Sequence, residues 1–220
     1  MQTVIESRFH GELIGMYKVF DNLLPDGLVS RIRSKLTSDQ FNWYALDNLS
    51  TGENDQKYNF TYVDNYKYIE TNGMSSLIYK DDMWFTSYEI YMMARQIIDY
   101  VLQEEKIKLR RVLRVKVNFL TNNTDHEFNE MCINFPHVDS YSEHKVLVYY
   151  VNDSDGDTVL FNEKWQVGDD LKPITLTTEA RVQPKAGRIL MFDGLQYHTS
   201  QNPIKSKFRY IININFAEEI

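Results

Sequence analysis

The chain has 220 residues, of which 43% are hydrophobic, 25% charged and 14% aromatic, a globular composition that excludes intrinsic disorder. The net charge of −7 argues against nucleic acid as a partner, because the phosphate backbone is bound by basic surfaces. No apolar run reaches the roughly 20 residues of a membrane span, so we expect no membrane partner. A single cysteine, Cys132, excludes an internal disulfide, and no signal peptide is evident at the N-terminus. Both features favour a cytoplasmic location.

A single domain over residues 1–220 is predicted, because the chain lacks repeats, low-complexity tracts and Pro/Gly linkers. Its two parts differ in character. Residues 1–110 are interpreted as helical support with an irregular cover, and residues 111–220 as a catalytic core rich in strands.

The first part begins with a predicted strand at residues 16–20 and a helix that ends near Leu36. Residues 40–84 are rich in Asn, Asp, Tyr and Gly without clear periodicity. We expect them to form a long irregular cover with short strands, and they are a candidate lid. A second helix is predicted at residues 87–105, where apolar residues recur at helical spacing.

The second part consists of short segments that alternate or run apolar, separated by turn residues. The expected strands cover residues 114–120, 131–136, 145–151, 158–162, 188–192 and 208–216. Several strands after a helical half predict an α+β, mainly β fold. We expect a double-stranded β-helix, the cupin-like jelly roll, flanked by N-terminal helices. Such a barrel is open at one end and can hold a metal and a small ligand.

Two histidines and one aspartate form the most informative pattern. His137 and Asp139 are two positions apart, with Val138 between them. In an extended segment both therefore point to the same side and Val138 points away. His198 is expected at the exit of the opposing strand. Two imidazoles and one carboxylate are the facial triad of non-haem Fe(II) oxygenases, which leaves positions free for a co-substrate and O2. Each motif alone is weak, and zinc would accept the same ligands.

Arg209 lies near the start of the apolar segment 208–216. A buried arginine needs a partner, and its guanidinium pairs bidentately with carboxylates. A salt bridge to the distal carboxylate of 2-oxoglutarate is the functional interpretation. A structural pair with one of the chain's own acids, or exposure at a strand end, is the alternative. Asn118 and Asn134 lie on strands near the proposed site, where structural hydrogen bonding is the simpler interpretation for each.

Taken together, these residues resemble the Fe(II)/2-oxoglutarate-dependent dioxygenase superfamily, most closely its prolyl-4-hydroxylase-like branch. The resemblance covers roughly residues 112–217. It is carried by His137-Val138-Asp139, the strand 147–152, the turn 156–158, the segment 184–192, His198 and Arg209-Tyr210.

The resemblance implies that His137, Asp139 and His198 bind Fe(II) and are catalytic. It implies a hydroxylase that uses 2-oxoglutarate and O2 and releases succinate and CO2. The expected substrate is a small molecule or a peptide, such as a peptidyl proline, another amino-acid side chain or a metabolite. A cupin-like metalloenzyme that does not use 2-oxoglutarate and a non-catalytic binding barrel are the alternatives. The sequence favours no particular oligomeric state.

The resemblance also assigns co-substrate contacts. It implies that Arg209 binds the C5 carboxylate of 2-oxoglutarate and that the Tyr150 hydroxyl reaches the same group. Alternation along the strand makes Val148 the neighbour of Tyr150 on that face. Many members of the superfamily carry a small or hydroxylated residue at the position of Ile211, so one polar contact to the co-substrate is expected to be missing here.

Overall fold

The computed structural model describes residues 12–14, 17–46, 59–62, 64–69, 71, 73–122, 129–169 and 172–219. Their helices are α1 (Asp26–Leu36) and α2 (Tyr88–Glu105). Their strands are β1 (Glu12–Ile14), β2 (Tyr17–Phe20), β3 (Tyr44–Leu46), β4 (Asn59–Tyr62), β5 (Lys67–Tyr68), β6 (Gly73–Lys80), β7 (Met83–Trp84), β8 (Leu109–Thr121), β9 (Cys132–Ile133), β10 (Lys145–Tyr150), β11 (Thr158–Lys164), β12 (Pro173–Leu176), β13 (Thr178–Val182), β14 (Ile189–Asp193), β15 (Gln196–Ser200) and β16 (Phe208–Glu218).

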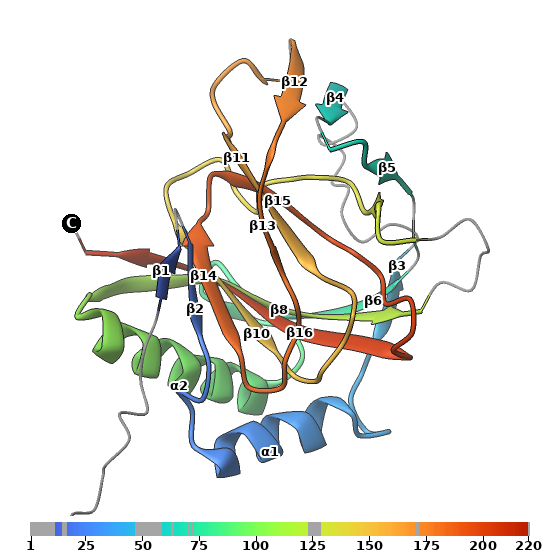
Figure 1. The fold of residues 1–220 in the computed structure, drawn as a ribbon. Helices are drawn as coiled ribbons and strands as arrows, with labels where there is room; N and C mark the ends of the chain where they lie inside the picture. The colour runs from blue at the N-terminus through green and yellow to red at the C-terminus, as the bar shows by residue number, and fades with distance from the viewer. Residues whose placement is uncertain are drawn as a thin grey trace, which may run out of the picture.

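Two antiparallel sheets form the barrel (Figure 1). The large sheet has the strand order β1-β2-β14-β10-β16-β8-β6-β3, with β7 also paired to β6, and the small sheet has the order β13-β11-β15. An isolated bridge between His137 and His198 adds the segment around His137 to the small sheet beside β15. Two facing sheets with this strand order are a double-stranded β-helix, so the predicted mainly-β jelly roll is confirmed.

The large sheet is buried on both faces at β10, which explains the continuous apolar run of this strand. Leu147 and Tyr149 pack on the helix side, in the same core cluster as residues of α1 and α2. Val146, Val148 and Tyr150 point the other way and pack against residues of the small sheet. All five side chains are at most 3% exposed. Alternation along β10 therefore separates a helix-side core from the barrel interior.

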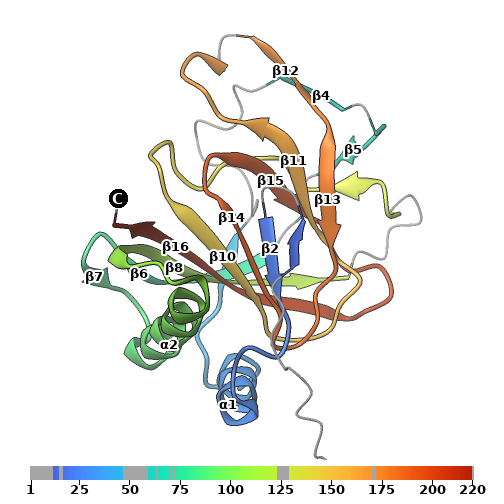
Figure 2. The same ribbon diagram turned by 60° about the vertical axis from the view of Figure 1, so that its left-hand side comes forward.

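The helices cover the face of the large sheet that points away from the small sheet (Figure 2). The N-cap of α2 is Ser87, whose hydroxyl accepts a 3.3 Å hydrogen bond from the backbone N–H of Ile90. Its C-cap, Lys106, has the left-handed conformation that commonly ends helices. Neither described helix has the length and apolar character needed to span a membrane.

The sequence interpretation of residues 40–84 is wrong for residues 73–80. These residues form β6, a full strand of the large sheet paired with β8. The buried polar pair Ser75 and Ser76 and a register shift after Leu77 hide the alternation that would mark a strand. Similarly, His198 lies in the middle of β15 and not at a strand exit.

Candidate metal centre and co-substrate pocket

The backbone holds His137 and His198 directly opposite each other. His137 N–H donates to the His198 carbonyl at 2.9 Å, and His198 N–H donates to the His137 carbonyl at 3.0 Å. The ring centroids are 4.7 Å apart. Paired residues of antiparallel strands share a face of the sheet, so both imidazoles project into the barrel.

Both rings are oriented by a hydrogen bond through Nδ1. The Nδ1 of His137 lies 3.1 Å from the Phe135 carbonyl, and that of His198 lies 3.0 Å from the Gln196 carbonyl. Since a carbonyl only accepts, each Nδ1 carries a proton, and in the neutral ring this tautomer has its lone pair on Nε2. The His198 Nε2 atom is buried and has no hydrogen-bond partner in the described part of the chain. This is the tautomer in which imidazole binds a metal.

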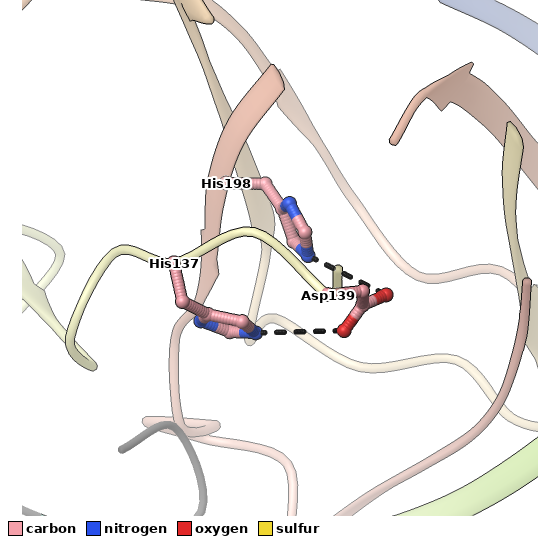
Figure 3. Close-up of side chains that lie close together, drawn as sticks. All are labelled: His137, Asp139 and His198. Atoms are coloured by element: carbon pink, nitrogen blue, oxygen red, sulfur yellow. Dashed lines mark ion pairs between the residues drawn. The ribbon is translucent and has the colours of Figure 1, made fainter. Parts of the chain in front are cut away.

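Asp139 completes the cluster (Figure 3). Its Oδ1 is 3.9 Å from His137 Nε2, and its Oδ2 is 4.0 Å from His198 Nε2. One ligand atom from each of the three residues lies within 4.8 Å of the others. Two ligands on the same face of one ion, with bonds of about 2.0–2.2 Å, lie roughly 3 Å apart. The three ligand atoms therefore converge on one point, and they would draw together by about 1 Å to bind an ion.

The charge states of these side chains suit a cation. Burial raises the pKa of Asp139, but Arg114, His198, His137 and a hydrogen bond from Asn215 outweigh it and hold the pKa well below its usual range. Burial, and next to it the neighbouring His137, lower the pKa of His198 to about 4, and Asp139 opposes the shift. At neutral pH the site therefore presents an ionised carboxylate and a neutral imidazole, the forms that bind metals.

Three side chains that sequence reasoning missed hold the Asp139 carboxylate. Asn213 and Asn215 of β16 donate to Oδ2 at 2.9 and 2.8 Å, and Arg114 of β8 donates to Oδ1. The sequence carries a signal for the asparagines. Both lie an even number of residues after Arg209 on the same strand, and this spacing places them on its face. Such outer contacts fix the orientation of a metal ligand.

Arg209 is buried at 2% exposure, and no carboxylate among the described residues forms an ion pair with it. Its Nε donates to the Gly156 carbonyl at 2.7 Å, and its Nη2 donates to Thr158 Oγ1 at 2.8 Å. Burial lowers the pKa of Arg209, against the influence of Tyr150 and Asp157. A buried cation with only neutral partners is the expected state of a carboxylate-binding arginine before its ligand arrives.

Tyr150 and Val148 occupy different positions relative to Arg209. The Tyr150 hydroxyl donates to Thr158 Oγ1 at 2.8 Å, so tyrosine and arginine converge on one threonine, which sequence reasoning did not identify. Because Thr158 Oγ1 accepts from both, its own O–H is available to a ligand. Val148 belongs to the apolar cluster of the barrel interior and is paired across the sheet with Asn213.

Ile211 lies between Arg209 and Asn213 on β16. It is paired with Tyr150 across the sheet and shares a face of β16 with Arg209 and Asn213. The four residue steps from Arg209 to Asn213 span about 13 Å of strand. One face of β16 therefore runs from the lone arginine, past an apolar residue, to the asparagines that hold Asp139.

Comparison of the sequence with protein-family models finds no match, and comparison with curated proteins finds none either. The fold, in contrast, is shared with solved structures. One is an oxidoreductase of the 2-oxoglutarate–Fe(II) oxygenase family from Burkholderia pseudomallei, with 9% identity over 92% of this chain and 85% of that chain and a TM-score of 0.59.

A second is SnoK, a non-haem α-ketoglutarate-dependent carbocyclase of nogalamycin biosynthesis, with 10% identity, coverage of 92% and 79%, and a TM-score of 0.57. A third is HygX from Streptomyces hygroscopicus, solved with nickel and 2-oxoglutarate, with 11% identity, coverage of 93% and 83%, and a TM-score of 0.52. At these identities the similarity confirms the fold predicted from the resemblance, which is that of Fe(II)/2-oxoglutarate oxygenases.

Proposed function

We propose that the protein is an Fe(II)- and 2-oxoglutarate-dependent dioxygenase that hydroxylates a C–H bond of a small molecule or peptide and releases succinate and CO2. One observation carries the proposal. The His137–Asp139–His198 cluster and Arg209, which has no carboxylate partner among the described residues, face the same barrel interior. The chemistry of a metalloenzyme that does not use an oxo-acid would not require Arg209, a buried arginine without a carboxylate partner among the described residues.

When bound, Fe(II) and 2-oxoglutarate supply the oxidising chemistry, and the protein supplies placement and exclusion of water. The two imidazoles and the carboxylate would bind one face of the ion and leave the other to the co-substrate and O2. Arg209 and the Thr158 hydroxyl would hold the far carboxylate of the oxo-acid.

The surroundings cover part of the reaction centre and orient its ligands. Leu190 and Phe192 line the interior beside the metal ligands, and the Phe192 and His198 rings are 4.8 Å apart. Arg114, together with Asn213 and Asn215, holds the Asp139 carboxylate in a fixed orientation. The Asp139 side chain is 5% exposed, and burial strengthens its charge interactions.

The test begins with anaerobic protein, to which Fe(II) and then 2-oxoglutarate are added. We expect a weak visible charge-transfer band, and, on admission of air, conversion of 2-oxoglutarate to succinate. His198→Gln is expected to give neither signal. Iron binding without the band would favour the metalloenzyme that does not use 2-oxoglutarate, and no iron binding would favour the non-catalytic barrel. Either result would refute the proposal.

A further inference from the structure

A row of polar side chains on β8 lies on the side of the sheet that faces the candidate metal centre. The proposed function assigns a role to Arg114 but none to Lys116 or Asn118. Alternation places Arg114, Lys116 and Asn118 on one face of the strand, while Val115 and Val117 are buried in the helix-side core. Across the sheet these three residues pair with Asn215, Asn213 and Ile211 of β16, respectively. The row therefore shares the barrel-facing side with the asparagines that hold Asp139.

Each member of the row has a polar atom without a partner among the described residues. The Arg114 Nε and Asn118 Oδ1 atoms are buried and make no hydrogen bond there. Lys116 is half-buried, and its ammonium group forms neither an ion pair nor a hydrogen bond with the residues that the structure describes. Burial, and next to it the neighbouring Arg114, lower the pKa of Lys116 to about 8, and Asp139 opposes the shift.

The charges on this side of the barrel do not balance. Asp139 accepts a charged hydrogen bond from Arg114 and is the proposed metal ligand, so it leaves no carboxylate for Lys116. A desolvated ammonium is costly unless an anion pairs with it. An unpaired acceptor such as Asn118 Oδ1 likewise calls for an N–H or O–H donor.

The residues proposed to bind the co-substrate, Arg209 and Thr158, are different from those of this row. Arg209 pairs across the sheet with Leu120, four residues or about 13 Å along β8 from Lys116. The lysine is thus paired with Asn213, which holds Asp139, and lies away from the arginine proposed for the C5 carboxylate.

We propose that Lys116 and Asn118 bind the substrate, and that the substrate is an anion: a carboxylate or phosphate with a neighbouring N–H or O–H group. This inference rests on the proposed function and specifies its substrate class. Lys116 pairs with the anionic group, Asn118 Oδ1 accepts from the neighbouring donor, and together they position a C–H bond beside the metal ligands.

The first experiment measures protection of Lys116 from an amine-reactive label, read by mass spectrometry on the full chain. The probes are inorganic phosphate, a panel of N-acetyl amino acids, and the matched N-acetyl amino-acid amides. We expect the lysine to be labelled in the protein without probe, and the anions to slow labelling several-fold while the neutral amides do not. A lysine that resists labelling without any probe is covered by the chain itself, which would overturn the inference. Equal effects of acids and amides, or no effect of any anion, would overturn it as well.

The second experiment compares the binding of the same probes to Lys116→Met, Lys116→Arg and a distant control, Lys35→Met. Lys35 lies on α1 and pairs with Glu89, on the helix side of the sheet. We expect Lys116→Met to weaken binding of the acids by about 10- to 100-fold and to leave the amides unchanged. Lys116→Arg should recover most of the loss, and Lys35→Met should bind like the wild type.

Titration of the charge-transfer band separates this inference from the proposed function. If Lys116→Met weakens 2-oxoglutarate binding as much as it weakens the acids, the lysine belongs to the co-substrate site and the inference fails while the proposed function stands. If the wild type gives no band, the proposed function fails, and anion-selective protection of Lys116 still reports whether the lysine is an anion site.

Discussion

Replacement of Arg209 by methionine separates a ligand-binding arginine from a structural one. Methionine keeps a long, unbranched side chain and removes the charge. The folded protein loses two hydrogen bonds, from Nε to Gly156 and from Nη2 to Thr158, worth together about 3 kcal/mol for a charged donor. It also loses the penalty of a buried charge that has no described counter-ion, which is several kcal/mol. The free energy of unfolding should therefore fall by no more than about 1 kcal/mol.

The effect on 2-oxoglutarate should be much larger. Loss of a buried charged pair costs about 2–5 kcal/mol, and 3 kcal/mol corresponds to roughly a 150-fold rise in Kd. Anaerobic titration of the charge-transfer band at fixed Fe(II) measures the affinity, and urea unfolding of the metal-free protein measures the stability.

Arg188→Met is the matched control, because Arg188 forms a bidentate pair with Asp21, with both distances 2.7 Å. It should lower stability by about 1 kcal/mol and leave 2-oxoglutarate affinity unchanged. An Arg209→Met protein that is several kcal/mol less stable and binds 2-oxoglutarate normally would show that Arg209 is structural.

Two further predictions concern stability alone. Burial and the neighbouring His137 lower the pKa of His198 to about 4 in the folded state, against an ordinary value of 6.5. Between these two pH values the unfolded chain therefore binds a proton that the folded protein does not. The free energy of unfolding of the metal-free protein should thus be highest above pH 6.5 and fall by roughly 3 kcal/mol as the pH falls to 4, as measured by urea unfolding. An equally steep fall in His198→Gln would show that His198 is not its cause. Gly194→Ala should cost about 1–3 kcal/mol, since a Cβ there would overlap the buried ring of His144. Gly27→Ala, a helical position with open space around it, should be neutral or stabilising, and equal thermal shifts for the two variants would refute the packing argument.

Local pattern was sufficient to predict several features of the site. Because a single residue, Val138, separates His137 from Asp139, the sequence predicted that both side chains point to one side and that Val138 points away. Val138 packs into a separate apolar cluster. The apolar run of β10 predicted a buried strand, and its alternation correctly placed Val148 beside Tyr150 on the interior face. Both inferences depend on the two-residue alternation of side chains between the faces of a strand, which can be read directly from the sequence.

Features that depend on distant partners were not predictable in the same way. The sequence predicted a strand over residues 114–120 with Asn118 near the site, and only the pairing with β16 shows that Arg114 and Lys116 share its barrel-facing side. Thr158 has no distinctive local pattern, and its role emerges from two donors that lie 8 and 51 residues away in the chain. Sequence alternation identifies the faces of a strand but not what each face meets.

Binding of Fe(II) under anaerobic conditions, measured by equilibrium dialysis, tests most directly whether the three ligands form one site. We predict one ion per wild-type chain, and a loss of affinity of more than about 100-fold in each of His137→Ala, Asp139→Ala and His198→Ala, since loss of outer contacts alone costs 10- to 100-fold. His144→Gln, which changes a nearby buried histidine outside the cluster, should bind iron like the wild type. Wild-type affinity in any of the three ligand variants would contradict a shared metal centre.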